Sequence, residues 1–137
     1  MPERETVSPT APAKDSTVYV AGHRGLVGSA ILKRLEKTGY TNLIARTSRE
    51  LDLRDPSAVE NFFAEQKPAF IFLAAAKVGG ILANDTFPGD FIRDNLSIQL
   101  NVIEAARRHG AIKLMFLGST CIYPREAPQP IPESALL

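Results

Sequence analysis

The chain has 137 residues, of which 45% are hydrophobic, and this is enough for one domain with a substantial core. Its 16 basic and 15 acidic side chains leave a net charge of +1 without a long run of either sign, so nothing favours binding to nucleic acid or to an anionic membrane. With a single cysteine, neither a disulfide framework nor a thiolate metal cluster is expected, and we predict no metal site. The longest uncharged run is far shorter than the roughly 20 apolar residues of a membrane span.

The first sixteen residues, MPERETVSPTAPAKDS, are rich in proline and charge and lack the apolar segment of a secretory signal. We expect a disordered leader over residues 1–16, order from Thr17 onward, and a cytoplasmic location.

The first predicted strand is TVYVAG, residues 17–22, a β-branched and aromatic run that a glycine closes. The segment 26–39 then has helical spacing of apolar residues and ends at Gly39, a plausible helix stop. Its expected apolar stripe comprises Leu26, Val27, Ala30, Ile31 and Leu35.

NLIA, residues 42–45, reads as a second short strand. Asp55 and Pro56 then form a helix start signal, with a capping aspartate before a proline at the first helical position. Val59, Phe62 and Phe63 form the expected inner face of that helix. Pro68 ends it, and AFIFLAAA, residues 69–76, is a third strand that is apolar on both faces.

A long helix is expected between about Phe87 and Gly110, followed by a fourth strand, KLMFLG, over residues 113–118. The side chains expected to face inward are Phe91, Ile92, Leu96, Leu100, Val102, Ile103 and Ala106.

Short apolar strands that alternate with helices predict an α/β fold, a doubly wound parallel sheet covered on both faces. We expect an incomplete sheet of about four strands in the order 3-2-1-4, with an uncovered edge beyond the fourth strand. In that order strands one and four are neighbours, so Gly22 and Gly118 would open into one crevice at the carboxyl ends of the strands.

Gly22, Gly25 and Gly28 recur at a spacing of three in AGHRGLVGSA, between the first strand and the first helix. Glycines at this place allow a tight turn, a close approach of backbone N–H groups to a phosphate, and close packing of helix and strand. The pattern therefore predicts binding of a dinucleotide.

The residues after the second strand indicate which dinucleotide is bound. Enzymes that use NAD usually carry Asp or Glu there, whereas this chain has Arg46, with Arg24 in the glycine loop and Arg49 close by. Guanidinium groups favour the 2′-phosphate of NADP. Asp52 either meets the adenine amino group or makes a local turn bond.

Ser119, Thr120 and Cys121 follow the fourth strand and have several interpretations. A serine nucleophile lacks the second glycine of the GxSxG turn, and a metal site lacks clustered ligands. A serine that bonds a carbonyl beside a nicotinamide, with the cysteine as an extra acid–base, fits the crevice. Alternatively, Cys121 is only a small buried residue.

Four segments carry a resemblance to a known family: AGHRGLVGSAI, LAAAKVGGI, FLGSTCIYP and PIPESALL. Through them the chain, from Thr17 to Leu137, resembles the extended short-chain dehydrogenase/reductase family with its Rossmann fold. Within that family it is similar to bifunctional epimerase–reductases that act on a GDP-sugar.

The resemblance implies that GDP-4-keto-6-deoxy-D-mannose is epimerised at C3 and C5 and then reduced at C4 with NADPH. Ser119 would bond the C4 oxygen, and Cys121 would remove the protons, which the neighbouring ketone acidifies. Some relatives have their second NADP arginine two residues after Arg46, where this chain has Ser48 followed by Arg49.

We expect the cofactor to contact the glycine loop, the ends of strands two and three, and the residues after strand four. The complete set is Gly22, His23, Arg24, Gly25, Leu26, Val27, Gly28, Arg46, Arg49, Asp52, Leu53, Ala74, Ala75, Leu117, Gly118, Ser119 and Thr120.

The family's reductase step uses a Tyr-x-x-x-Lys pair, which these 137 residues lack, because Tyr19, Tyr40 and Tyr123 are followed four positions later by His, Ile and Ala. We therefore expect residues 17–137 to be the N-terminal part of an NADP-binding domain that is inactive alone and belongs to a homodimeric parent. The alternatives are a non-catalytic NADP-binding module, or an epimerase or dehydratase for another sugar nucleotide.

Overall fold

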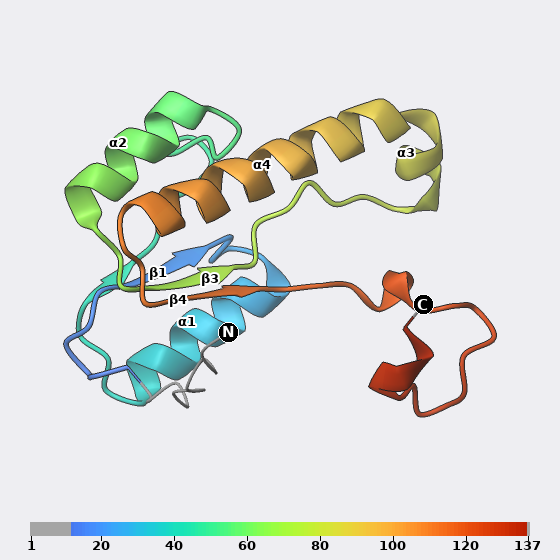
Figure 1. Cartoon of the computed structure of the whole chain (residues 1–137), viewed down its shortest axis with the longest axis horizontal. Coiled ribbons are helices and arrows are strands. Elements are labelled where there is room, and N and C mark those ends of the chain that lie inside the picture. Colours follow the sequence, from blue (N-terminus) through green and yellow to red (C-terminus); the bar gives the residue numbers. More distant parts are fainter. Residues whose placement is uncertain (1–11, 137) are drawn as a thin grey trace, which may run out of the picture.

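The computed structural model describes residues 12–136, and residues 1–11 and 137 lie outside the described part. Helices and strands alternate along the chain (Figure 1). The elements are β1 (Val18–Ala21), α1 (Leu26–Lys37), β2 (Leu43–Ile44), α2 (Pro56–Gln66), β3 (Phe70–Leu73), α3 (Ile81–Thr86), α4 (Pro88–Arg108), β4 (Lys113–Phe116) and two short 3₁₀ helices, η1 (Thr120–Ile122) and η2 (Glu133–Ala135).

The four strands form one parallel sheet in the order β2-β1-β3-β4. In its centre, Val18 pairs with Leu43 of β2 on one side and with Phe70 of β3 on the other. The predicted doubly wound α/β fold is confirmed, but the expected order of strands is wrong, because β3 and not β4 lies beside β1. The observed order is also doubly wound, and its switch point lies between β1 and β3.

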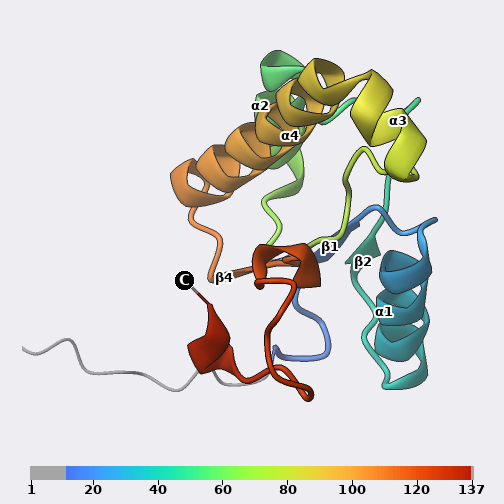
Figure 2. The same cartoon turned by 90° about the vertical axis from the view of Figure 1, so that its right-hand side faces the viewer.

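The winding direction reverses after β2, and this reversal explains the difference. The chain passes from β1 to β2 through α1 and then returns across β1 to β3 through α2. Right-handed crossovers in opposite directions place their helices on opposite faces of a sheet. Accordingly, α1 covers one face, while α2 and α4 cover the other (Figures 1 and 2). Hydrophobic periodicity does not say which face a helix covers.

The two faces of β1 supply two separate cores. Val18 and Val20 pack with Leu35 on the α1 side, whereas Tyr19 and Ala21 belong to the larger core under α2 and α4. All four strand residues are at most 1% exposed. This double burial is the reason why the strand reads as continuously apolar and does not alternate.

An aromatic cluster lies at the centre of the larger core. The Tyr19 ring lies 4.7 Å from that of Phe62 and 6.2 Å from that of Phe63, measured between centroids. Val59, Phe62 and Phe63 are all buried, which confirms the predicted inner face of α2.

The predicted helix boundaries also have their expected chemistry. The Asp55 carboxylate accepts hydrogen bonds from the backbone N–H groups of Ser57 (2.8 Å) and Ala58 (3.1 Å), so it caps α2. Gly39 follows the end of α1 with a φ of +85°, the left-handed conformation that a helix stop requires.

The first described residues contact the turn after α1. The Tyr40 hydroxyl donates to the carbonyl of Pro12 (3.3 Å), and the Thr41 N–H donates to that of Lys14 (2.9 Å). Residues 12–16 of the expected leader thus contact the domain, and its remainder, residues 1–11, lies outside the described residues.

The inner face of α4 differs from the prediction. Val102 and Ala106 are buried as expected, together with Ile98 and Ala105. In contrast, Ile92, Leu96, Leu100 and Ile103 are exposed, with Leu100 at 70%. The helix carries two apolar stripes, and only tertiary packing decides which of them meets the sheet. Leu26 and Val27, expected on the apolar stripe of α1, are exposed as well.

Two further features concern the end of the sheet and the approach to α4. Among residues 12–136, β4 is the last strand in the order, and Met115 and Phe116 are exposed on it, which agrees with the expected open edge. The short helix α3, which precedes α4, was not predicted.

We expect Phe63→Ala to lower the free energy of unfolding by about 3–5 kcal/mol, because it leaves a cavity among tightly packed rings. Urea unfolding followed by circular dichroism measures the change. Phe87→Ala, at a side chain that is 55% exposed, is the matched control and should cost only roughly 0.5 kcal/mol. Equal losses for the two variants would contradict the assignment of Phe63 to the core.

Candidate functional site

The loop between β1 and α1 depends on close backbone contacts. Gly22 has a φ of +82°, and a Cβ at this position would lie 2.7 Å from the backbone of Ala74. A Cβ on Gly28 would overlap the carbonyl oxygen of Gly22. Glycine therefore allows the loop, the first turn of α1 and the residues after β3 to meet.

The N-terminus of α1 points into this loop without a side-chain cap. Gly25 is the N-cap residue, and its own N–H donates to the carbonyl of Gly22 (2.9 Å). The first turn of α1 contains no acidic side chain. The free N–H groups and the positive end of the helix dipole are thus available to an anion.

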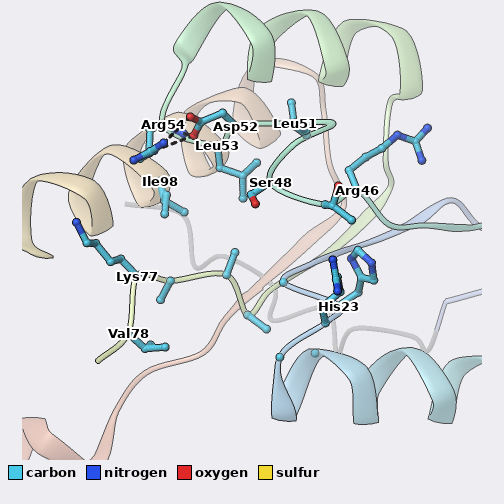
Figure 3. A pocket seen from close by; sticks show the side chains of 18 of the residues that line it. His23, Arg46, Ser48, Leu51, Asp52, Leu53, Arg54, Lys77, Val78 and Ile98 are labelled. Carbon is cyan, nitrogen blue, oxygen red and sulfur yellow. Dashed lines mark hydrogen bonds and ion pairs between the residues drawn. The ribbon is translucent and has the colours of Figure 1, made fainter. Parts of the chain in front are cut away.

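A cavity of about 670 Å³ lies against the glycine loop, at the carboxyl ends of β1, β2 and β3 (Figure 3). This is the switch point of the sheet, where ligands bind in doubly wound folds. Most of the residues expected to contact a cofactor line it. They are Gly22, His23, Arg24, Gly25, Leu26, Val27, Gly28, Arg46, Asp52, Leu53, Ala74 and Ala75.

The other expected residues do not line this cavity. They are Arg49, Leu117, Gly118, Ser119, Thr120 and Cys121. The expectation that strands one and four are neighbours is wrong, because β3 lies between β1 and β4. Within the loop after β4, the Ser119 hydroxyl oxygen accepts a hydrogen bond from the Cys121 N–H (3.2 Å), and the Cys121 thiol is exposed and free.

Two of the three candidate arginines, Arg24 and Arg46, line the cavity, and Arg49 does not. The acidic residue nearest to Arg46 and Arg49 in the sequence is Glu50. Its carboxylate accepts hydrogen bonds from the N–H (2.7 Å) and the hydroxyl (2.8 Å) of Thr47. These bonds, the backbone one foremost, lower the pKa of Glu50. The Glu50 carboxylate is therefore hydrogen-bonded to Thr47, within the same turn.

His23 also lines the cavity, next to Gly22. Its Nδ1 atom is buried and, among the residues that the structure describes, has no hydrogen-bond partner. An unsatisfied buried nitrogen is costly, so this atom is available to a ligand or a water molecule.

Asp52 makes a local turn bond, which was one of its two predicted roles; the other was contact with the adenine amino group. Its carboxylate accepts from the backbone N–H of Arg54 (3.0 Å) and forms an ion pair with the same guanidinium at 2.7 Å. The hydrogen bond from the Arg54 side chain is the main reason why the pKa of Asp52 is lowered.

A second carboxylate, that of Asp94 on α4, also lines the cavity. Only 3% of the residue is exposed, and three cations surround it: Lys77 at 2.9 Å, Arg93 at 2.8 Å and Arg54 at 3.4 Å. Hydrogen bonds from Lys77 and then Arg93 lower the pKa of Asp94 to about 2. The group therefore stays ionised across the physiological range.

Sequence reasoning assigned no role to Asp94 or Lys77. A signal for Asp94 was present, because it precedes Ile98 by four residues and Val102 by eight, on the stripe that proves to be buried. A charge on such a stripe needs a partner. Lys77 lies in the segment LAAAKVGGI, but nothing in the spacing of residues links it to α4.

Residues 12–136 contain neither a candidate metal site nor a candidate membrane span. Side chains of His, Cys, Asp and Glu in this range form no group of three or more that could hold a metal ion. No helix in the same range has both the length and the hydrophobicity needed to cross a bilayer.

The parallel sheet, its glycine loop and the cavity at the switch point define an α/β domain of the Rossmann type. Residues 18–137 match the model of the NAD dependent epimerase/dehydratase family. The chain belongs to this family.

Several proteins with assigned activities are similar to the chain. It is 61% identical to GDP-L-fucose synthase 1 of Arabidopsis thaliana over 90% of its length, and 54% identical to GDP-L-fucose synthase of Escherichia coli over 88%. These alignments cover only 38% and 37% of the two relatives, so the chain spans little more than a third of their length. Among solved structures, MlghC, a GDP-mannoheptose C4 reductase from Campylobacter jejuni with NADP bound, is 41% identical with a TM-score of 0.86, over 92% of this chain and 40% of that one.

We expect Asp94→Asn to lower stability at neutral pH, with a difference from the wild type that shrinks in acid. The folded-state pKa of about 2 lies below the ordinary value of 3.8, so the carboxylate stabilises the fold above about pH 4 and loses this effect as the pH falls toward 2. Urea unfolding between neutral pH and pH ~2 measures the difference in the free energy of unfolding.

Glu104→Gln is the control for this experiment. Its pKa is also lowered to about 2, by a hydrogen bond from Arg107, but its side chain is 41% exposed, so solvent screens the pair. A loss at neutral pH that is no larger for Asp94→Asn than for Glu104→Gln would contradict the role of Asp94 as a buried ionised group.

Proposed function

We propose that this chain is the NADP-binding part of a sugar-nucleotide epimerase–reductase of the GDP-L-fucose synthase type. The proposed overall reaction is the NADPH-dependent 3,5-epimerisation and 4-reduction of GDP-4-keto-6-deoxy-D-mannose to GDP-L-fucose. The observation that carries the proposal is the cavity in which the glycine loop meets Arg24 and Arg46. The names of the relatives support the GDP-sugar substrate, and the NADP in the similar reductase supports the cofactor.

The described residues fit a dinucleotide with a 2′-phosphate. The glycine loop and the start of α1, which has no side-chain cap, offer backbone N–H groups to the pyrophosphate. This loop conformation needs glycine, because a Cβ on Gly22 or Gly28 would collide with neighbouring backbone. Arg24 and Arg46 supply guanidinium groups for the 2′-phosphate. Of the two arginines after β2, Arg46 is the proposed ligand of the 2′-phosphate, because Arg46 lines the cavity and Arg49 does not.

Ser119 and Cys121 are the proposed catalytic residues of this chain. Because the Ser119 hydroxyl oxygen already accepts the Cys121 N–H, its hydrogen is free to be donated to the C4 oxygen of a substrate. The Cys121 thiolate would take a proton from C3 or C5, where the 4-keto group acidifies the C–H bonds. When bound, NADPH supplies the hydride for C4.

The family resemblance adds a tyrosine–lysine pair for the reduction, and these 137 residues contain no Tyr-x-x-x-Lys. The proposed active enzyme is therefore a longer protein, a homodimer of the cytoplasm by the same resemblance. In it, this chain supplies the cofactor site together with Ser119 and Cys121.

A non-catalytic NADP-binding module is the second candidate. It is favoured by the position of Ser119 and Cys121, which follow β4 and do not line the cavity. The two candidates agree on cofactor binding and differ on whether Cys121 does chemistry.

We expect the chain to bind NADPH more tightly than NADH, and Arg24→Ala and Arg46→Ala each to raise the Kd for NADPH about tenfold to a hundredfold. The reason is that a hydrogen bond to a charged group is worth about 1.5–3 kcal/mol. Titration with NADPH, followed by its fluorescence, measures the Kd. Arg49→Ala is the matched control and should leave the Kd unchanged, whereas a wild-type chain that prefers NADH would refute the assignment of NADP.

We expect the 137-residue chain to show no turnover with NADPH and GDP-4-keto-6-deoxy-D-mannose, because the proton donor for the reduction is missing. The absorbance of NADPH over time measures the rate, and a full-length relative such as the Escherichia coli enzyme is the positive control. Substrate-dependent oxidation of NADPH by this chain would overturn the assigned division of roles.

A further inference from the structure

The side chain of Arg54 binds both oxygens of the Asp52 carboxylate. Its Nε donates to Oδ1 (2.9 Å) and its Nη2 donates to Oδ2 (2.7 Å), while the backbone N–H of Arg54 also donates to Oδ1 (3.0 Å). Figure 3 shows the two side chains joined by dashed lines, and both residues line the cavity. Paired bonds between a guanidinium and a carboxylate fix the plane of the carboxylate as well as its position.

The third nitrogen of the same guanidinium contacts the buried carboxylate of α4. Nη1 of Arg54 donates to Oδ2 of Asp94 at the longer distance of 3.4 Å. Asp94 is only 3% exposed and also pairs with Lys77 and Arg93, so its own position is well defined. Arg54 therefore connects the half-exposed carboxylate of Asp52 to a fixed point in the interior.

The hydrogen bonds leave one oxygen of Asp52 able to accept a further donor. Each carboxylate oxygen has two lone pairs. Oδ1 accepts two hydrogen bonds, from the side chain and the backbone of Arg54, whereas Oδ2 accepts one. Because the Asp52 side chain is 43% exposed and the residue lines the cavity, Oδ2 is accessible to an N–H group of a ligand.

The proposed 2′-phosphate site determines which part of a dinucleotide reaches Asp52. The 2′-phosphate and the purine are attached to the same ribose, so a phosphate at Arg24 and Arg46 brings the purine to the segment that follows β2. In this segment Asp52 lies between Leu51 and Leu53, which are buried and line the same cavity (Figure 3). The exocyclic amino group of adenine is a hydrogen-bond donor that matches the free lone pair of Oδ2.

We propose that Arg54, bonded to Asp94, is a positioning residue that orients the Asp52 carboxylate toward the 6-amino group of the purine. Arg54 thereby makes the site selective for adenine over a 6-oxopurine, an inference that rests on the proposed function. A 6-oxo group presents lone pairs where adenine presents hydrogens, so it would face the carboxylate without a hydrogen bond. Without Arg54 the Asp52 side chain is free to rotate, and fixing its acceptor on binding then costs entropy.

The geometry separates this role from a general contribution to stability. The side chains of Arg54 and Asp52 are 53% and 43% exposed, and an ion pair with such exposure contributes little to folding. Asp94 keeps its two closer partners, Lys77 at 2.9 Å and Arg93 at 2.8 Å, when Arg54 is replaced. A variant at position 54 should therefore fold and lose mainly the orientation of Asp52.

The test is Arg54→Gln in the whole chain, titrated in parallel with NADPH and with deamino-NADPH, in which a 6-oxo group replaces the 6-amino group. We expect the wild type to bind NADPH about tenfold more tightly than deamino-NADPH, and the variant to bind the two within about twofold of each other. Loss of a cation from the cavity weakens both ligands alike, so the ratio of the two Kd values isolates the contact with the base. The fluorescence of the dihydronicotinamide measures both Kd values.

Arg93→Gln is the matched control, because it also removes a cation from Asp94 but lies outside the cavity lining, and it should keep the wild-type ratio. Arg54→Lys is the second variant, in case Arg54→Gln does not fold. Its ammonium can bond one oxygen of Asp52 but cannot form the paired bonds, so an intermediate ratio is expected.

A ratio that stays at the wild-type value in the folded variants at position 54 overturns the inference, as does a wild-type chain that binds both dinucleotides equally well. A wild-type chain that binds neither of them instead overturns the proposed function itself.

Discussion

The backbone at Gly22 touches the backbone at Ala74, and the shape of the cavity depends on this contact. A Cβ at Gly22 would lie 2.7 Å from the Ala74 carbonyl group. The left-handed φ of Gly22 would also be strained for any residue with a side chain. The contact places the start of α1 beside the carboxyl end of β3, so that free N–H groups face the switch point. Larger residues would separate the loops and displace the N-terminus of α1 from the crevice.

The opposite side of the cavity is organised by charge. Taking the Asp94 carboxylate out of water is unfavourable, and a buried ion pair is by itself weak support for stability. Here the carboxylate connects Lys77, Arg93 and Arg54, which come from the loop after β3, from α4 and from the segment after β2. The network thus adds ion pairs between elements that the larger core also joins through Leu53, Ile98 and Ala75.

The local features of the fold were predictable because short-range chemistry determines them. Asp55 caps α2 and Gly39 ends α1, as helix-terminal geometry requires, and the strands were found from their apolar runs. The glycine loop was predictable for the same reason. The two apolar stripes of α4 were not resolved, because periodicity identifies a stripe without identifying its partner, and Leu96 and Leu100 prove to be exposed while Ile98 is buried.

The sequence by itself determined the fold class, the four strands, the helices other than α3, and the glycine loop, and it offered three candidate arginines for a 2′-phosphate. Only the tertiary structure decided that β3 lies between β1 and β4, that Arg46 rather than Arg49 lines the cavity, and that α4 attaches to Lys77 through Asn95. The first set follows from contacts within a few residues of the chain. The second set depends on contacts between distant segments, such as that of Asn95 with Lys77. These contacts form only when the strands have assembled in the observed order.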